Sequence, residues 1–356
     1  MEPSPTFQAG LRFLTEDVAP VAERIDQDPE ELRKVLARMG ELGLCALRRP
    51  LKYGGPEMEE GEFRRWQEEL ARRSGTLAFL QTQHQSAVGM IASSDNDELK
   101  QATLPGMHDG TRGIGIGFSQ LRRSGDPIMR ATPVPGGYVL AGHVPWVTGW
   151  TFYPEFLIGA SLPDGRSVFA IVPLTTQEGV VVSPPMRLAA MGAALTVTVD
   201  FSGFFVPDAL VAFIRPAGWI QNNDKINIAL QGHFALGCAQ AGIDIVRSVA
   251  ARKPFPFLSS AADSLQSELD DCRTEMVNGG DPRDEGTTEA RLQFRAWVID
   301  LAVRCAHAGV TASSGAANSL DNRAQRVYRE ALVYTVSAQT PDVMRATINR
   351  LSQRHR

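Results

Sequence analysis

The sequence predicts an α+β protein in which helical segments flank a middle antiparallel β unit. Apolar residues recur at three- and four-residue steps from about Thr6 to Leu104, as in amphipathic helices. Short β-branched and aromatic runs separated by turn residues follow, and long helical patterns return in the last third. The chain of 356 residues exceeds one typical domain. We therefore expect an N-terminal helical domain at 1–112, a β domain at 113–213 and a C-terminal helical domain at 214–356.

The N-terminal helices are predicted from three amphipathic stretches. They read LRFLTEDVAPVAERI, ELRKVLARMGELGL and MEEGEFRRWQEELARRSG, with charged residues between the apolar ones. Glycine commonly follows the last turn of a helix, so Gly40, Gly43 and Gly75 are predicted to mark helix ends. These stretches favour a helical bundle with a polar exterior.

The β unit is predicted from two turn signals and the runs beside them. Asp164-Gly165 separates FLIGASLP from RSVFAIVP and indicates a hairpin, and Gly136-Gly137 indicates a second turn. We expect the β region to end near Pro207.

The C-terminal unit is predicted from helical patterns that follow Trp219. Two stretches between them, KPFPFLSSAADSLQ and MVNGGDPRDEGTTEA, are rich in Pro, Gly, Ser and Asp, and we expect loops there. No internal repeat is evident.

Composition excludes several classes of function. The formal net charge is -4 and no basic tract is interleaved with aromatic residues, so no nucleic-acid partner is expected. No apolar stretch reaches the roughly 20 residues of a membrane span, and the N-terminus carries no export pattern. Four widely spaced cysteines predict neither a zinc site nor a disulfide framework, so a reducing cytoplasm is expected. The apolar settings of His84, His233 and His307 favour core residues over metal ligands.

The segment from Ser119 to Trp150 carries the most informative pattern. It reads SQLRRSGDPIMRATPVPGGYVLAGHVPWVTGW, with Asp126, Gly142 and Trp146 at fixed spacing. This segment resembles the acyl-CoA dehydrogenase family, whose members run TEPxAGSD, a turn, then GYxLxGxKxWITN. Two further stretches resemble the same family: MGAALTVTVDFSGFFVP beginning at Met191, and GAANSLDNRAQRVYREALVYTVSAQT ending at Thr340.

The resemblance implies an FAD cofactor and a set of cofactor-binding residues. A flavin ring is a flat apolar plane with a polar edge, so it needs an aromatic or aliphatic wall and a few hydroxyl or backbone donors. By register, Ser119, Trp146 and Thr148 would lie against the ring. The cofactor-binding residues that the resemblance implies are Phe118, Ser119, Ser124, Trp146, Thr148, Gln339 and Thr340.

The catalytic base is expected at Asp321. Many family members use a Glu in the C-terminal segment to remove the α-proton of an acyl thioester, and by register that position is Asp321. Asp321 could equally cap the helix that follows it. The segment departs from the family at Ala338-Gln339, which replace Glu-Gly of EGT. The stretch ARKPFPFLSS stands in place of RxxFG, whose Arg assists the FAD of a neighbouring subunit.

Arg122 and Arg123 have two interpretations. They could receive a phosphate or another anion at the mouth of the site, or remain solvated surface charge.

The resemblance implies a flavin-dependent oxidoreductase that acts on a small molecule such as an acyl-CoA. Two alternatives stay open: a flavin-dependent monooxygenase on the same fold, which would need no catalytic Glu, and a family member without chemistry. The resemblance also implies a homodimer or homotetramer, with the apolar helices around Ala235 and Val303 as the contact surface.

Overall fold

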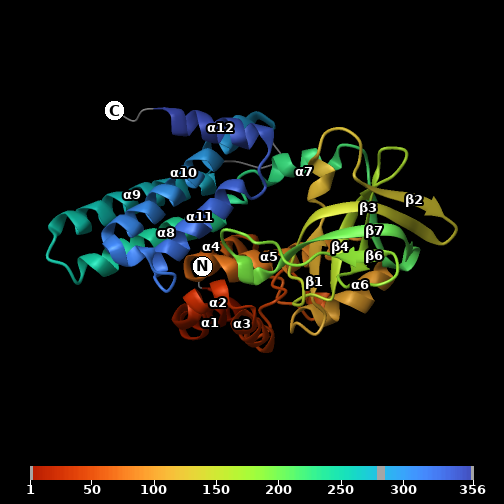
Figure 1. Cartoon of the computed structure of the whole chain (residues 1–356), viewed down its shortest axis with the longest axis horizontal. Coiled ribbons are helices and arrows are strands. Elements are labelled where there is room, and N and C mark those ends of the chain that lie inside the picture. Colours follow the sequence, from red (N-terminus) through yellow and green to blue (C-terminus); the bar gives the residue numbers. More distant parts are fainter. Residues whose placement is uncertain (1–2, 279–284, 354–356) are drawn as a thin grey trace.

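The computed structural model of the chain describes residues 3–278 and 285–353. Figure 1 shows the strands gathered at one end of the molecule and the C-terminal helices side by side at the other, with the first helices below them. The predicted order of helices, strands and helices is confirmed.

The N-terminal helices begin at residues suited to cap them. The side chains of Ser4, Asp28 and Ser74 each accept a hydrogen bond from a free amide of the first turn that follows. Gly75, predicted as a helix end, is instead the first residue of a helix, directly after the Ser74 cap. The helices are α1 (Pro5–Phe13), α2 (Ala22–Gln27), α3 (Pro29–Glu41), α4 (Glu60–Arg73), α5 (Gly75–Ala92) and α6 (Asp97–Thr103).

The strands form one sheet in the order β6-β7-β3-β2-β4-β5-β8, with β1 also paired with β4. Both predicted hairpin turns are confirmed, between β2 and β3 and between β4 and β5, and Gly136 and Gly165 have positive φ. The sheet is mixed, since β1 runs parallel to β4. The strands are β1 (Ile114–Gly117), β2 (Met129–Val134), β3 (Gly137–Thr148), β4 (Glu155–Ser161), β5 (Ser167–Pro173), β6 (Val180–Val182), β7 (Thr196–Pro207) and β8 (Val211–Arg215).

The expectation that the β region ends near Pro207 is wrong, because β8 follows. This strand has only five residues and pairs antiparallel with β5. A strand this short is held by its partner, which sequence periodicity does not show.

The C-terminal helices include one that was predicted as a loop. KPFPFLSSAADSLQ is helical from Pro256, because Leu258, Ala262 and Leu269 of this stretch and its continuation are buried at helical spacing. Of the second predicted loop, residues 279–284 lie outside the described residues. None of the helices in the described part of the chain is long and apolar enough to cross a membrane. The helices are α7 (Trp219–Asn227), α8 (Gly232–Ala250), α9 (Pro256–Asn278), α10 (Thr288–Ser313), α11 (Arg323–Val336) and α12 (Pro341–Ser352).

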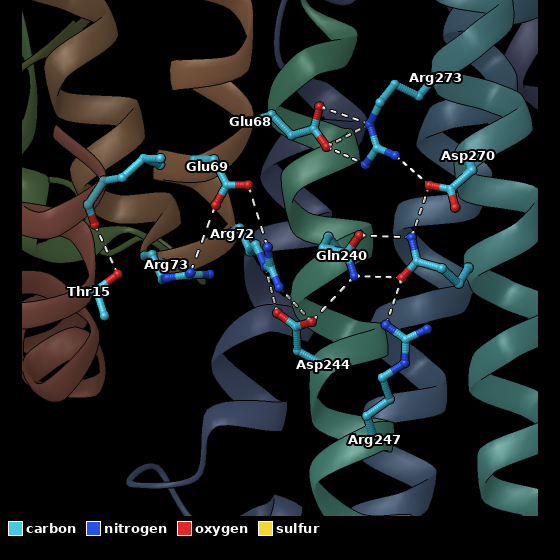
Figure 2. Close-up of polar contacts among 12 residues, drawn as sticks. Thr15, Glu68, Glu69, Arg72, Arg73, Gln240, Asp244, Arg247, Asp270 and Arg273 are labelled. Carbon is cyan, nitrogen blue, oxygen red and sulfur yellow. Dashed lines mark hydrogen bonds and ion pairs between the residues drawn. The ribbon is translucent and has the colours of Figure 1, made fainter. Parts of the chain in front are cut away.

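The N-terminal and C-terminal helices share one hydrophobic core. Phe7 and Trp66 belong to the same buried cluster as Leu236 and Leu301, and α4 packs along α8. Polar side chains of α4 and α8 also contact each other at the edge of this core, as Figure 2 shows. Arg72 donates to both carboxylate oxygens of Asp244, at 2.7 and 3.0 Å. The two helical segments are therefore joined through α4 and α8.

Candidate functional site

A bulge in β3 turns Trp146 outward. Between Val144 and Val147, β3 advances by three residues while its partner β7 advances from Val199 to Val197 only, so β3 contains one extra residue. Pro145 lies within this irregularity and has no backbone N–H to give to the ladder. Val144 and Val147 are both buried, whereas Trp146 is 49% exposed. The indole therefore offers a flat apolar surface to a ligand.

Thr148 ends the same strand and is buried beside Thr196. Their hydroxyl oxygens lie 2.9 Å apart across β3 and β7. The next residue, Gly149, has a φ of +103° and donates its N–H to Ala194 O at 2.9 Å. The end of β3 is thus fixed against the 3₁₀ turn Gly192–Ala194.

Ser119 carries a buried hydroxyl for which the described residues supply no hydrogen-bond partner. It lies in the 3₁₀ turn Ser119–Arg122, directly after β1, and this turn packs against β3. Gln120 anchors the turn by donating to Gly117 O and Gly159 O, at 3.2 and 2.7 Å. A buried polar atom without a partner is uncommon and needs a water or ligand to satisfy it. Ser119 Oγ is therefore available to a cofactor.

The other predicted cofactor residues are more dispersed. Phe118 packs edge-on against Phe169, with ring centroids 5.7 Å apart. Ser124 is exposed in the loop before β2. Gln339 and Thr340 lie in the α11–α12 loop, where Thr340 caps α12 by accepting from Val343 N–H at 3.3 Å. Gln339 Oε1 is buried and without a hydrogen-bond partner within the described residues.

Asp321, the predicted base, lies apart from these residues. It is exposed in the turn before α11, and the neighbouring Leu320 O accepts a hydrogen bond from Gln27 of α2. The cap of α11 is Asn322, whose Oδ1 accepts from Ala324 N–H at 2.9 Å, so the capping interpretation of Asp321 is wrong by one residue.

Arg122 is paired with Asp224 of α7. Its guanidinium donates to both carboxylate oxygens at 2.7 Å, so this charge is already matched. Arg123 is exposed and follows the turn. Trp219, at the start of α7, packs against Phe169 and Phe213, with centroids 5.3 and 6.3 Å apart. α7 is thereby attached to the sheet beside Ser119.

Sequence reasoning did not identify a buried group of charges where α11 meets α2 and α5. Glu330 is fully buried and accepts from Gly75 N–H at 2.9 Å and from Arg326 Nη1 at 2.7 Å. Burial raises the pKa of Glu330, against the opposing effect of the Arg326 charge. Arg329 Nη2 donates to Asp26 Oδ2 at 2.5 Å. From the sequence alone, only the i,i+4 spacing of Arg326 and Glu330 could have indicated that these two side chains form an ion pair.

A cavity of about 450 Å³ opens elsewhere, between α3, α5 and the segment after β3. Its lining includes Arg33, Cys45, His84 and Tyr153, and none of the predicted cofactor residues. His84 is held by backbone groups: Nδ1 lies 3.1 Å from Ile114 N, and Nε2 lies 2.8 Å from Met107 O. Burial lowers the pKa of His84, so the ring is neutral at pH 7. This histidine is a core residue, as predicted.

Comparisons with known proteins agree with the fold. Residues 8–111 match the family model described as acyl-CoA dehydrogenase, N-terminal domain. The chain is 24% identical to mitochondrial isovaleryl-CoA dehydrogenase of Pongo abelii, over 96% of this chain and 86% of that protein.

Solved structures share the whole architecture. The complex of glutaryl-coenzyme A dehydrogenase with glutaryl-CoA superposes with a TM-score of 0.81 at 16% identity, covering 99% of this chain and 97% of that one. The acyl-CoA dehydrogenase of Bacillus anthracis, complexed with FAD, gives a TM-score of 0.80 at 18% identity, over 97% of this chain and 66% of that one. The similarity to acyl-CoA dehydrogenases thus extends from the family match at residues 8–111 to the sequence and fold of nearly the whole chain, at 24% identity or less to the relatives named here.

Proposed function

We propose that the protein is a flavin-dependent oxidoreductase that binds FAD at the C-terminal end of β3, beside Trp146 and Thr148. The observation that carries the proposal is the combination, on adjacent elements, of an exposed indole at Trp146, a buried hydroxyl at Thr148 and a hydroxyl at Ser119 that has no partner among residues 3–278 and 285–353. These groups match a flat ring with a polar edge. A solved relative in the superfamily is described as complexed with FAD.

Each of these residues has a distinct role in the proposal. Trp146 forms an apolar wall for the ring, and Ser119 Oγ donates a hydrogen bond to its polar edge, which favours the charge that reduction places there. Thr148 is oriented by Thr196, so its hydroxyl is held in place before the cofactor arrives. FAD, when bound, supplies the acceptor for a hydride.

The substrate class that we propose is an acyl-CoA thioester. Relatives named for isovaleryl-CoA and glutaryl-CoA support this class. In the reaction the substrate loses an α-proton to a base and a β-hydride to the cofactor, leaving an α,β double bond. Register gives the role of base to Asp321, whereas this residue lies exposed in the turn before α11, apart from Ser119 and Trp146. Asp321→Asn tests the assignment: a large loss of kcat supports it and an unchanged kcat excludes it.

Flavin binding is the first test of the function. The purified chain is mixed with FAD or FMN, unbound cofactor is removed, and the visible spectrum is recorded. We expect a retained FAD band in the wild type and a strongly reduced one in Trp146→Ala. Phe257→Ala, at an aromatic residue that is 66% exposed on α9, is the control and should retain the band. A wild-type chain that retains no flavin would rule out the oxidoreductase and favour a family member without chemistry.

A flavin-dependent monooxygenase is the second candidate. The α11–α12 loop has Ala338 where the family motif has Glu, so this loop offers no carboxylate at that position. The two enzymes differ in their electron acceptor. Oxygen consumption by the reduced flavoprotein, without reduction of an artificial acceptor by acyl-CoAs, would favour the monooxygenase.

The expected self-association fits α11 and α12 better than the helices named from sequence. Ala235 of α8 is completely buried within the chain, and Val303 of α10 is half-buried and packs against the core, so neither residue presents the contact surface expected there. On α11, exposed apolar side chains recur every four residues, and α12 carries a similar stripe. Two exposed apolar stripes of this kind form a surface that favours a partner. The exposed residues are Tyr328, Leu332, Val336, Met344, Ile348 and Leu351.

We propose that a second copy of the chain covers this surface in a homodimer or homotetramer in the cytoplasm. Leu332→Glu with Ile348→Glu should shift the protein to a monomer in analytical ultracentrifugation. Leu51→Glu, at a residue that is 67% exposed outside this surface, is the control. An unchanged sedimentation coefficient in the double variant would exclude this surface.

A further inference from the structure

Arg295 of α10 is a fully buried cation that has no acidic partner among the described residues. Only 1% of its surface is exposed. Burial lowers its pKa to about 10. Its Nη1 atom has no hydrogen-bond partner within the described residues either. An unpaired buried charge is strongly unfavourable, so a group of this kind is a candidate for a functional role.

The contacts of Arg295 place it at the end of α11. Nη2 donates to Tyr334 O at 3.2 Å and to Ser337 O at 3.1 Å. The last four carbonyls of a helix lack intrahelical donors, and a cation near them also matches the negative end of the helix dipole. Ser337 is held again by Val333 O, which accepts from its N–H and its hydroxyl, both at 2.8 Å. Arg295 therefore fixes how the chain leaves α11.

The loop that follows α11, Ser337–Thr340, contains a residue in an unfavourable backbone conformation. Ala338 has a φ of +50°, in the left-handed region that residues with a β-carbon disfavour. Only Ala338 and Gln339 separate the last turn of α11, closed by Ser337, from Thr340, which caps α12. A strained residue in so short a loop persists only where the surroundings enforce it, and such residues cluster at functional sites.

We propose that Arg295 is the positioning residue of the Ser337–Thr340 loop and sets Gln339 and Thr340 for cofactor binding. The inference rests on the proposed function, which assigns these two residues to FAD. One nitrogen of Arg295, Nη2, at the far end of the side chain, donates to both carbonyls. Lys has a shorter reach, and Met fills the space without donating. Both substitutions should release the loop.

The test uses Arg295→Met and Arg295→Lys, with Arg304→Met as the matched control. Arg304 lies on the same helix and donates to Glu268 Oε2 at 2.9 Å and Asp300 Oδ2 at 3.2 Å, remote from the loop. Hydrogen exchange of the loop amides is measured in the FAD-free chain. The Kd for FAD and the flavin reduction potential are measured after reconstitution.

We expect faster loop exchange in both Arg295 variants and a Kd for FAD that rises about tenfold, equivalent to about 1.4 kcal/mol. A shifted reduction potential would accompany this change in loop position. Arg304→Met should lower the melting temperature and leave the loop exchange, Kd and potential as in the wild type. Equal loop exchange and equal Kd in the Arg295 and Arg304 variants would overturn the proposal.

FAD binding by the chain and the positioning of the loop by Arg295 can each fail without the other. If the wild-type chain takes up no FAD, the proposed function fails, while exchange in the FAD-free chain still decides whether Arg295 holds the loop. If Arg295→Met does not fold, Arg295→Lys decides, because it keeps the charge and most of the volume.

Discussion

Gly237 of α8 lies directly against the backbone of α4 at Glu68. A β-carbon at Gly237 would come within 2.1 Å of Glu68 O, and backbone cannot yield as a flexible side chain can. Beside this contact, Arg273 of α9 binds the Glu68 carboxylate, as Figure 2 shows. The absence of a side chain at Gly237 is what allows the N-terminal and C-terminal helices to share one core.

Gly237→Ala should therefore destabilise the protein by about 1–3 kcal/mol, the range for overpacking a core. The control is Gly89→Ala on α5, where a β-carbon would meet nothing within 4 Å. There the better helix propensity of Ala should raise the unfolding free energy by up to about 1 kcal/mol. Urea unfolding measures both. Equal effects of the two substitutions would contradict the close contact.

His233 should make the protein less stable in mild acid. Burial, with Arg64 and Arg273 nearby, lowers its pKa from 6.5 to about 3. Between these values the unfolded chain binds a proton that the folded chain does not, so the unfolding free energy falls as the pH falls, by at most about 1.4 kcal/mol per unit.

His233→Gln removes the imidazole that binds this proton in the unfolded chain, while keeping a polar side chain. Urea unfolding of both proteins at pH 7, 6 and 5 should show a shallower loss in the variant. Parallel curves for the two proteins would mean that His233 does not titrate as expected.

All four cysteines should resist thiol reagents in the folded protein. They are free and buried. Burial raises the pKa of Cys45 and Cys305 to about 12, and the thiolate is the reactive form. A disulfide reagent at pH 8 should label none of them until urea is added. The raised pKa values also mean that stability falls as the pH rises from about 9 towards 12. Rapid labelling of the native protein would contradict this burial.

Ala338→Gly should stabilise the protein. The left-handed conformation disfavours a residue with a β-carbon by roughly 1–2 kcal/mol, and part of the gain is offset by the greater freedom of Gly in the unfolded chain. We expect a net gain of up to about 1 kcal/mol in urea unfolding. The matched control, Ala308→Gly within α10, should lose about 1 kcal/mol. A destabilised Ala338→Gly variant would show that the loop is not strained.

The elements with a strong local pattern could be predicted from the sequence. The glycine turns at Gly136 and Gly165 and the amphipathic N-terminal helices depend on residues close together in the chain. β8 and α9 were missed for the opposite reason. β8 is stabilised by pairing with β5, and α9 carries Pro and Ser residues that locally favour loops but buries its apolar face on other helices.

In the candidate site, too, some residues could be predicted from the sequence and others could not. Ser119, Trp146 and Thr148 could be selected from the sequence because they lie within one short motif, on neighbouring elements. Arg295 gave no comparable signal, because its partners are backbone carbonyls at the end of another helix. Glu330 gave only its i,i+4 spacing from Arg326, because its other partner is the backbone N–H of Gly75.

The sequence by itself determined the order of helical, strand and helical segments, the motif that resembles acyl-CoA dehydrogenases and the residue types at the proposed cofactor site, because each depends on local spacing. Only the tertiary structure decided that the two helical segments share a core, that Pro145 accompanies a bulge that turns Trp146 outward, and that Arg295 holds the α11–α12 loop. These features depend on burial and on contacts between distant segments. The free energy of a buried polar or charged group depends on the atoms around it, and those atoms belong to residues far away in the sequence.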